Sequence, residues 1–362
     1  MTSDRLLGDL LAGRTAAVAR AISEVENARP GFEKLLAGAH AQLGRARRIG
    51  LTGPPGAGKS TLTERLVTAY RTRGLTVAVV AVDPTSPFTG GALLGDRIRM
   101  ESVALDPGVF IRSMASRGSL GGLATTTREV CDLLDAAGFA RILVETVGVG
   151  QSELDVARMA DSTVLILVPE SGDAIQTLKS GVMEVADLFV VNKADRPGAE
   201  TLRQEIEVTL DIRRGNAQQA GRRAGGPAGR DSAESPGSPL TAEAGSRSEP
   251  LPACPPARLP AWEHPVFLTT ASKGEGIDQL ADALDRHHEW LITSGELQHR
   301  RRQRLLERTR EVVERAARRW LWQETQAERL VCERLDDVAR GRLSPYEVAA
   351  EILDGLRQGE QV

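Results

Sequence analysis

The 362-residue sequence predicts an α/β fold with a mostly parallel central sheet. Seven short runs rich in aliphatic and β-branched residues alternate with segments of helical length, which is typical of parallel strands joined by crossover helices. The first run leads through a glycine-rich loop into a helical segment, which indicates a phosphate-binding turn at one edge of the sheet. The predicted strands cover residues 49–51, 76–82, 109–111, 142–144, 163–168, 188–191 and 266–268.

Helical patterns flank this region on both sides. Apolar residues recur near the 3.6-residue helical period in both flanks. We therefore predict a helical N-terminal extension over 1–45, a central domain over 46–295 and a C-terminal helical arm over 296–362. In the arm, an apolar stripe is expected to form the packing face. The arginines around it interleave with glutamates and are expected to form a solvated face. The stripe contains Leu305, Val312, Ala316 and Trp320.

Residues 215–260 break the alternation. Gly, Pro, Ser and Ala dominate this stretch, and its large apolar side chains are Leu240, Leu251 and Leu259. Such a composition buries too little surface to offset the entropy lost on ordering. We predict a disordered surface insertion, with a specific docking role as the alternative.

Composition excludes several classes of protein. With 46 basic and 49 acidic residues, the chain carries a net charge of −3, which argues against a nucleic-acid binder that depends on neutralising phosphates. The longest strongly apolar stretch, 77–82, is too short to cross a bilayer, and the N-terminus lacks a secretory signal. Three scattered cysteines form no disulfide framework. We expect a cytoplasmic protein that binds neither nucleic acid nor membrane, with His287 and His288 as a surface pair.

The stretch GPPGAGKST matches the phosphate-loop pattern G-x-x-x-x-G-K-[ST] in the required strand–loop–helix context. The glycines let backbone N–H groups turn toward phosphate oxygens, and the following helix adds its partial positive charge. Lys59 is expected to bridge the β- and γ-phosphates, and Ser60 to ligate Mg²⁺. The sequence thus predicts a P-loop NTPase whose nucleotide contacts include Gly53, Pro54, Pro55, Gly56, Ala57, Gly58, Lys59, Ser60 and Thr61.

The stretch NKAD follows the predicted strand 188–191. A carboxylate at Asp195 can accept two hydrogen bonds from guanine, one from N1–H and one from the exocyclic amine. Adenine offers neither donor in that geometry. Asn192 and Lys193 are expected to brace this loop, so the sequence predicts selectivity for GTP and GDP.

A second guanine-contacting loop is predicted after the last strand. The stretch TTASKGEG, residues 269–276, resembles the fifth loop of GTPases. There a backbone N–H group meets the guanine carbonyl. Here that group is expected near Ala271 or Ser272.

The stretch ETVGVGQSELD, residues 145–155, occupies the slot of the D-x-x-G turn of G proteins, with Glu in place of Asp. Glu145 is expected to reach Mg²⁺ through water, and the N–H of Gly148 to contact the γ-phosphate, so that the loop relaxes after hydrolysis. Ras-type enzymes place a water-orienting Gln directly after that glycine. Here Val149 stands there and the first glutamine is Gln151, so unaided hydrolysis should be slow.

Two further carboxylates follow a strand near the nucleotide. Asp83 and Asp96 lie in VDPTSPFTGGALLGDRIRM, residues 82–100. Either could hold Mg²⁺ or position the attacking water. For Asp96 the alternative is an ordinary charge at a helix N-terminus.

These motifs together resemble the methylmalonyl-CoA mutase-associated GTPases of the ArgK/MeaB type. The resemblance rests on LTGPPGAGKSTL, VDPTSPFTGGALLGDRIRM, FIRSMASRGSLGGLA, ILVETVGVGQSE, SGDAIQTLKSGVMEVADLFVVNKAD and GEGID, and it extends almost from end to end. The insertion between Leu210 and Trp262 departs from the family pattern. Members of the family usually connect the preceding helix to the last strand with fewer residues.

The resemblance implies a GTP-hydrolysing chaperone that gates adenosylcobalamin loading and protection of a cobalamin-dependent acyl-CoA mutase. It implies GTP/GDP and Mg²⁺ as ligands, slow basal hydrolysis that the partner stimulates, and a homodimer formed through the C-terminal arm. It also marks residues 171–187 as an additional switch. Asp173 and Lys179 are its charged positions, and with Gln151 they are the candidates for partner coupling.

Three other functions fit the sequence less well. A P-loop kinase acting on transport components would need a pocket for a hydroxyl substrate and usually adenine selectivity, against which NKAD argues. A metal-insertion GTPase for nickel would need Cys/His clusters. A signal-recognition GTPase would need a Met-rich domain, whereas the chain has five methionines.

Overall fold

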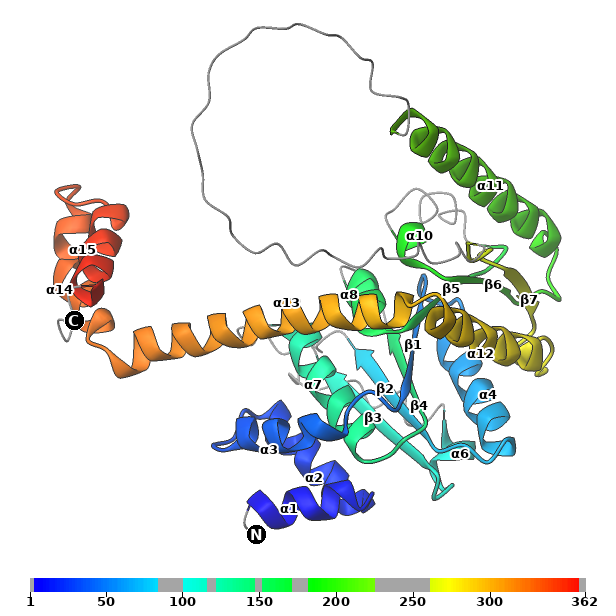
Figure 1. The fold of residues 1–362 in the computed structure, drawn as a ribbon, viewed down its shortest axis with the longest axis horizontal. Helices are drawn as coiled ribbons and strands as arrows, with labels where there is room; N and C mark the ends of the chain where they lie inside the picture. Colours follow the sequence, from blue (N-terminus) through cyan, green and yellow to red (C-terminus); the bar gives the residue numbers. More distant parts are fainter. Residues whose placement is uncertain are drawn as a thin grey trace, which may run out of the picture.

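The computed structural model describes residues 3–83, 100–115, 122–146, 152–170, 182–224 and 261–357. Its centre is a seven-stranded sheet in the order β3-β2-β4-β1-β5-β6-β7, and every pair of neighbouring strands is parallel (Figure 1). Each predicted strand lies in this sheet, which confirms the α/β fold class. The strands are β1 (Arg47–Thr52), β2 (Val77–Asp83), β3 (Val109–Ala115), β4 (Arg141–Thr146), β5 (Ser162–Leu167), β6 (Leu188–Asn192) and β7 (Val266–Thr269).

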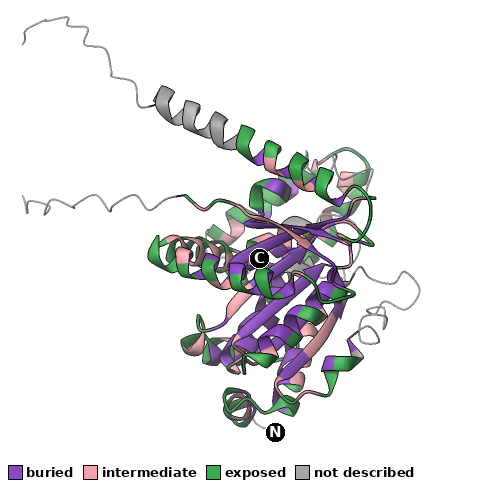
Figure 2. Cartoon of the chain, turned by 90° about the vertical axis from the view of Figure 1, so that its right-hand side faces the viewer, coloured by how far each residue is buried: buried purple, intermediate pink, exposed green. Residues whose placement is uncertain are grey.

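The sheet is covered on both faces. All residues of β4, β5 and β6 are buried, as expected for parallel strands enclosed between two helical layers (Figure 2). Alternate residues of each strand point to opposite layers: Val80 joins the core under one layer, and Val79 the core under the other. One layer contains α2 (Thr15–Glu26), α3 (Phe32–Ala39), α7 (Gly122–Ala136) and α8 (Ser152–Met159); the other contains α4 (Lys59–Thr72), α6 (Glu101–Ala104) and α12 (Ile277–Thr293).

The N-terminal extension is helical, as predicted. Helix α1 (Ser3–Leu11) precedes α2 and α3, and the three pack together against α7. Leu10, Val18 and Ile22 are fully buried and belong to the same hydrophobic core as β2 and β4. The extension is therefore part of the layer that covers one face of the sheet.

Helix α11 (Ala199–Ala224) is longer than the sequence indicated. It covers β6 and β7 and continues ten residues into the segment predicted to be disordered, of which 225–260 lies outside the described residues. Over the whole segment 215–260, Gly, Pro, Ser and Ala dominate the composition. Its first part, GNAQQAGRRA, contains several good helix formers and needs only local hydrogen bonds to continue the helix.

The C-terminal arm leaves the sheet domain through one long helix. Helix α13 (Glu296–Arg319) runs across the domain and ends in a π-helical turn, η2 (Trp320–Glu324). Beyond it, α14 (Ala327–Ala339) and α15 (Pro345–Arg357) form a hairpin with its own small core around Val348 and Ile352. No helix in the described ranges is both long and apolar enough to cross a membrane.

The arginines of α13 were expected on a solvated face, but several of them face the domain, and the apolar stripe of the helix faces outward. Arg301 donates to the Asp161 carboxylate at 2.8 Å, and Arg304 pairs with the same carboxylate while donating to the Ala160 carbonyl at 2.7 Å. Four more ion pairs follow along the helix: Arg300 with Asp187, Arg308 with Asp132, Arg315 with Glu129, and Arg319 with Glu33.

Buried carboxylates explain this orientation. Asp161, Asp187 and Asp132 are each at most 5% exposed, and a buried carboxylate is stable only when it is paired. The sequence pattern shows which residues share a helix face. It does not show that buried acidic groups elsewhere in the chain need the arginines of the charged face as ion-pair partners.

The histidine pair in α12 is also placed differently from the expectation of a surface pair. His287 and His288 are 0% and 7% exposed, and burial lowers the pKa of each to about 4. The Nδ1 of His287 lies 2.8 Å from the hydroxyl of Ser162, and its Nε2 lies 3.4 Å from Asp187. Both rings are therefore neutral parts of the core near pH 7.

Candidate nucleotide site

The phosphate loop lies between β1 and α4, at the carboxyl edge of the sheet where the strand order reverses. Ligands of open α/β sheets bind at this place. Two positions in the loop require glycine. A Cβ on Gly53, whose φ is +143°, would lie 2.1 Å from the Ile166 carbonyl oxygen, and one on Gly58, at φ +84°, 2.4 Å from the Asn192 amide nitrogen. The backbone of the loop thus packs directly against Ile166 of β5 and Asn192 of β6, with no room for a side chain at either glycine.

Lys59 folds back over this loop. Its ammonium group donates to the carbonyls of Gly53 at 2.6 Å and Pro54 at 3.0 Å. Ala57, Lys59 and Ser60 are buried, Pro54 and Gly58 are half-buried, and Pro55, Gly56 and Thr61 are exposed. The exposed tip and the cationic side chain behind it form an anion cradle at the N-terminus of α4.

Glu145 lies directly beside this cradle. It belongs to β4, which pairs with β1, and its side chain is fully buried. Its two carboxylate oxygens accept hydrogen bonds from Ser60 and Thr63, each at 2.5 Å. Two of the three residues predicted to hold magnesium, Ser60 and Glu145, are thus in contact. A hydroxyl beside a carboxylate fits Mg²⁺, which prefers oxygen donors.

Thr63 was missed by sequence reasoning. It lies three residues after Ser60 on α4, and residues at this spacing share a helix face. A hydroxyl there could therefore have been expected to point toward whatever Ser60 meets. The phosphate-loop pattern itself ends before Thr63.

Several predicted site residues cannot be placed. Asp83 ends β2, beside the strand that carries Glu145, but its side chain is outside what the structure describes. The remaining ones lie outside the described residues: Asp96, Gly148, Gln151, Asp173 and Lys179.

Asn192 joins three segments of the site. Its amide donates to the Ala57 carbonyl at 2.8 Å, and its Oδ1 accepts from the Thr269 hydroxyl and from the Ala271 N–H, both at 3.1 Å. The side chain is 2% exposed. Asn192 therefore links the phosphate loop to the loop after β7.

The other two residues of the NKAD loop are more open. Lys193 has a left-handed backbone, φ +55°, and its ammonium lies 3.8 Å from the Glu170 carboxylate. The Asp195 side chain is 39% exposed and pairs with Lys273 at 3.2 Å. The Asp195 carboxylate, on one of the two loops predicted to contact the base, is thus accessible to a ligand.

A second residue absent from the motifs holds the loop after β7. Arg65, on α4, donates to the carbonyls of Ala271 at 3.1 Å and Ser272 at 3.0 Å. No signal in the sequence marks this arginine, because the partners are backbone atoms 206 and 207 positions away.

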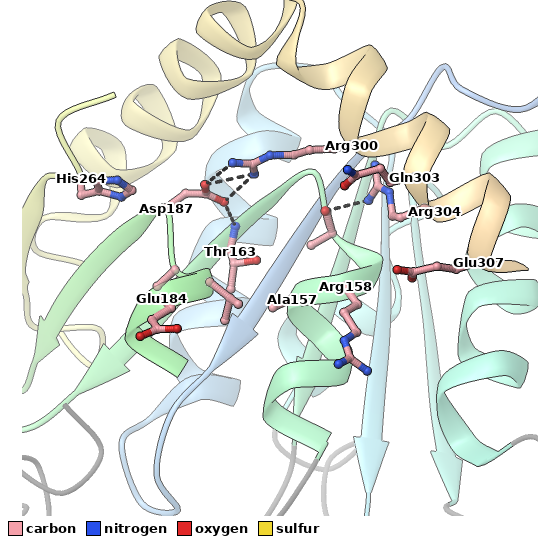
Figure 3. Close-up of a pocket in the computed structure, with 13 residues that line it drawn as sticks. Ala157, Arg158, Thr163, Glu184, Asp187, His264, Arg300, Gln303, Arg304 and Glu307 are labelled. Atoms are coloured by element: carbon pink, nitrogen blue, oxygen red, sulfur yellow. Dashed lines mark hydrogen bonds and ion pairs between the residues drawn. The ribbon is translucent and has the colours of Figure 1, made fainter. Parts of the chain in front are cut away.

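A separate cavity of about 310 Å³ lies at the amino edge of the sheet, away from the phosphate loop (Figure 3). The ends of α8 and of α10 (Val182–Val185) line it together with α13. Figure 3 shows Asp187 at its wall, facing Arg300, while its carboxylate also accepts the Thr163 N–H at 2.9 Å. Helix α8 begins within the predicted switch stretch 145–155, and α10 lies within the predicted switch 171–187.

Comparison with known proteins decides the family. The model of the methylmalonyl-CoA mutase-associated GTPase MeaB family matches residues 18–326. The chain belongs to this family. It is accordingly a P-loop GTPase that hydrolyses GTP to GDP and phosphate.

Individual relatives agree with this assignment. A protein of Pyrococcus abyssi described as a GTPase is 42% identical over 310 residues, 86% of this chain and 83% of that one. The GTPase ArgK of Escherichia coli is 34% identical over 353 residues, 96% and 92% of the two chains. The mitochondrial methylmalonic aciduria type A homolog of mouse is 34% identical over 315 residues, 82% of this chain and 66% of that one.

A solved structure has the same fold over nearly the whole chain. The crystal structure of a LAO/AO transport system kinase aligns with a TM-score of 0.63 at 28% identity, covering 98% of each chain. The similarity extends over the sheet domain and its flanking helices together.

Proposed function

We propose that this GTPase is a chaperone that gates adenosylcobalamin loading and protection of a cobalamin-dependent acyl-CoA mutase. The observation that carries the proposal is the family match over residues 18–326, because the family is described by its association with methylmalonyl-CoA mutase. The mouse relative named for methylmalonic aciduria supports the same partner class.

The residues of the phosphate site take the following roles. Ser60, Glu145 and Asp83 would hold Mg²⁺, which neutralises charge on the β- and γ-phosphates. Lys59 exchanges the carbonyls of Gly53 and Pro54 for phosphate oxygens. We assign the γ-phosphate contact to Gly148.

The rest of the mechanism concerns water, base and partner. The attacking water is positioned by Asp83 or Asp96. Asp195 binds the guanine edge, and Asn192 keeps the base loop and the phosphate loop in register. Gln151, Asp173 and Lys179 couple nucleotide state to the mutase.

This proposal is tested by single-turnover GTP hydrolysis with and without an adenosylcobalamin-dependent acyl-CoA mutase. We expect the mutase to raise the rate at least about tenfold, because ordering the switch loops supplies the positioning that Val149 cannot. Lys179→Ala should lower the ratio of stimulated to basal rate, whereas Lys59→Ala should lower the basal rate itself. If no such mutase changes the rate, the chaperone proposal fails, and phosphorylation of transport components becomes the hypothesis to test.

We further propose that the protein is a homodimer formed through the outward face of α13. Leu305, Val312 and Trp320 on this face are 48%, 40% and 48% exposed, and together they form an apolar stripe that α13 turns away from its own domain. An apolar helix face of this kind is typical of an interface between helices.

Light scattering on the full chain tests the dimer. Leu305→Glu combined with Trp320→Glu should shift the mass from dimer to monomer, because each places a charge in an apolar interface. Leu105→Glu is the matched control, since Leu105 is 93% exposed but lies apart from α13, after α6. A double variant that keeps the mass of the unmodified dimer would contradict this assignment.

A further inference from the structure

Arg65 connects the helix of the phosphate site to the loop after β7. Its Nε and Nη2 donate to two successive carbonyls, those of Ala271 at 3.1 Å and Ser272 at 3.0 Å. The planar guanidinium presents its donors in a rigid fork, so two adjacent carbonyls are held in a fixed relation by one side chain.

The opposite side of this loop is held as well. The Ala271 N–H donates to Asn192 at 3.1 Å, and the Lys273 N–H donates to the Thr270 carbonyl at 2.9 Å. Both neighbours of Ser272 therefore have their N–H groups directed into the protein. The peptide unit between Ala271 and Ser272 is held through its carbonyl, which accepts hydrogen bonds from Arg65 and from the Gly274 N–H at 3.2 Å.

The geometry of that peptide unit sets the direction of one further donor. A peptide is planar and trans, so the Ser272 N–H points opposite to the Ala271 carbonyl. With Arg65 on that carbonyl, the N–H is aimed away from Arg65.

We propose that Arg65 is a specificity-determining positioning residue, which aims the Ser272 N–H at the 6-carbonyl of guanine. The inference rests on the guanine contact proposed for this loop. A fixed N–H donor favours a 6-oxo purine and disfavours adenine, whose 6-amino group is itself a donor. Arg65 would thus contribute to base selection without touching the base.

Calorimetric affinities of full-length variants for GTP, ITP and ATP test this. Inosine keeps the 6-carbonyl but lacks the exocyclic amine that Asp195 is proposed to bind. Arg65→Ala should weaken GTP and ITP by the same factor, roughly tenfold for hydrogen bonds from a charged group, and leave ATP unchanged. The GTP and ITP affinities of Arg65→Lys should lie between those of the unmodified protein and Arg65→Ala, because an ammonium group cannot bind both carbonyls in the fixed geometry of a guanidinium. Asp195→Ala should instead reduce the preference for GTP over ITP.

Arg73→Ala is the matched control. Arg73 caps the C-terminal end of α4 and pairs with Asp282 of α12 at 2.8 Å, so its loss removes an arginine contact of the same helix but leaves the base loop alone. The ratio of GTP affinity to ATP affinity of the Arg73→Ala variant should equal that of the unmodified protein.

The outcomes distinguish guanine recognition itself from the role of Arg65 in it. If the unmodified protein binds GTP and ATP equally, the guanine contact itself is absent. If it discriminates and neither Arg65→Ala nor Arg65→Lys lowers the ratio, or if Arg73→Ala lowers it equally, the inference about Arg65 is overturned while guanine recognition stands.

Discussion

Replacing Glu145 with Gln is expected to slow GTP hydrolysis by roughly 100-fold, the effect of losing one preorganised electrostatic group at a reacting centre. Glu145 is fully buried and accepts hydrogen bonds from both Ser60 and Thr63. A glutamine offers only one oxygen acceptor, and it carries no charge for Mg²⁺. Single-turnover hydrolysis across a Mg²⁺ titration measures the effect, and the half-saturating Mg²⁺ concentration should rise along with the loss of rate.

The control for this variant is Glu64→Gln. Glu64 lies on α4 next to Thr63, but its carboxylate accepts a hydrogen bond from Ser102 at the exposed surface. Its removal should leave the Mg²⁺ dependence unaltered. A Glu145→Gln protein with the Mg²⁺ dependence of the unmodified protein would show that Glu145 has no part in holding the metal.

Replacing Asp161 with Ala is expected to lower the free energy of unfolding by about 3 kcal/mol, because two arginines would lose a buried partner. The Asp161 side chain is 1% exposed and pairs with Arg301 and Arg304. Burial alone would raise the pKa of Asp161, but hydrogen bonds and charge from these arginines outweigh it and hold the pKa well below its usual range.

The pH dependence of this contribution follows from the sign of that shift. A carboxyl whose pKa is lower in the folded state stabilises fully above its unfolded pKa of about 4 and loses that contribution as the pH falls through the folded value. The difference in stability between the unmodified protein and Asp161→Ala should therefore be constant from pH 8 to pH 5 and shrink only below about pH 4. Denaturant unfolding at several pH values measures it.

Asp155→Ala serves as the comparison. Asp155 is 3.9 Å from Arg158 in a largely exposed pair on α8, so its loss should change stability by less than about 0.5 kcal/mol. If Asp161→Ala costs no more than this, the buried pairs do not hold α13 to the domain.

The sequence predicts most reliably what local pattern encodes. All seven strands follow from short apolar runs, and the phosphate loop follows from spacing that only a tight, glycine-dependent turn requires. Asn192 was predicted as a brace because its motif has a fixed place after a strand. In these cases the residues that carry the signal also make the structure.

The failures share a different physical cause, which is dependence on a distant partner. The arginines of α13 were expected on a solvated face, but they bind buried Asp161 and Asp187 instead. Arg65 is invisible to any motif because it binds backbone carbonyls. The histidines of α12 look like surface residues until the fold places Ser162 and Asp187 beside one of them.

The ion pairs along α13 have a consequence for how the chain unfolds. Successive arginines of this one helix bind acidic groups of α3 and α7 and those that precede β5 and β6. If any of these elements detached, it would break an ion pair and leave both an arginine of α13 and its own acidic group without a counterion. We therefore expect the N-terminal helices, the sheet and α13 to melt in a single cooperative transition, so that these three parts of the chain form one thermodynamic unit.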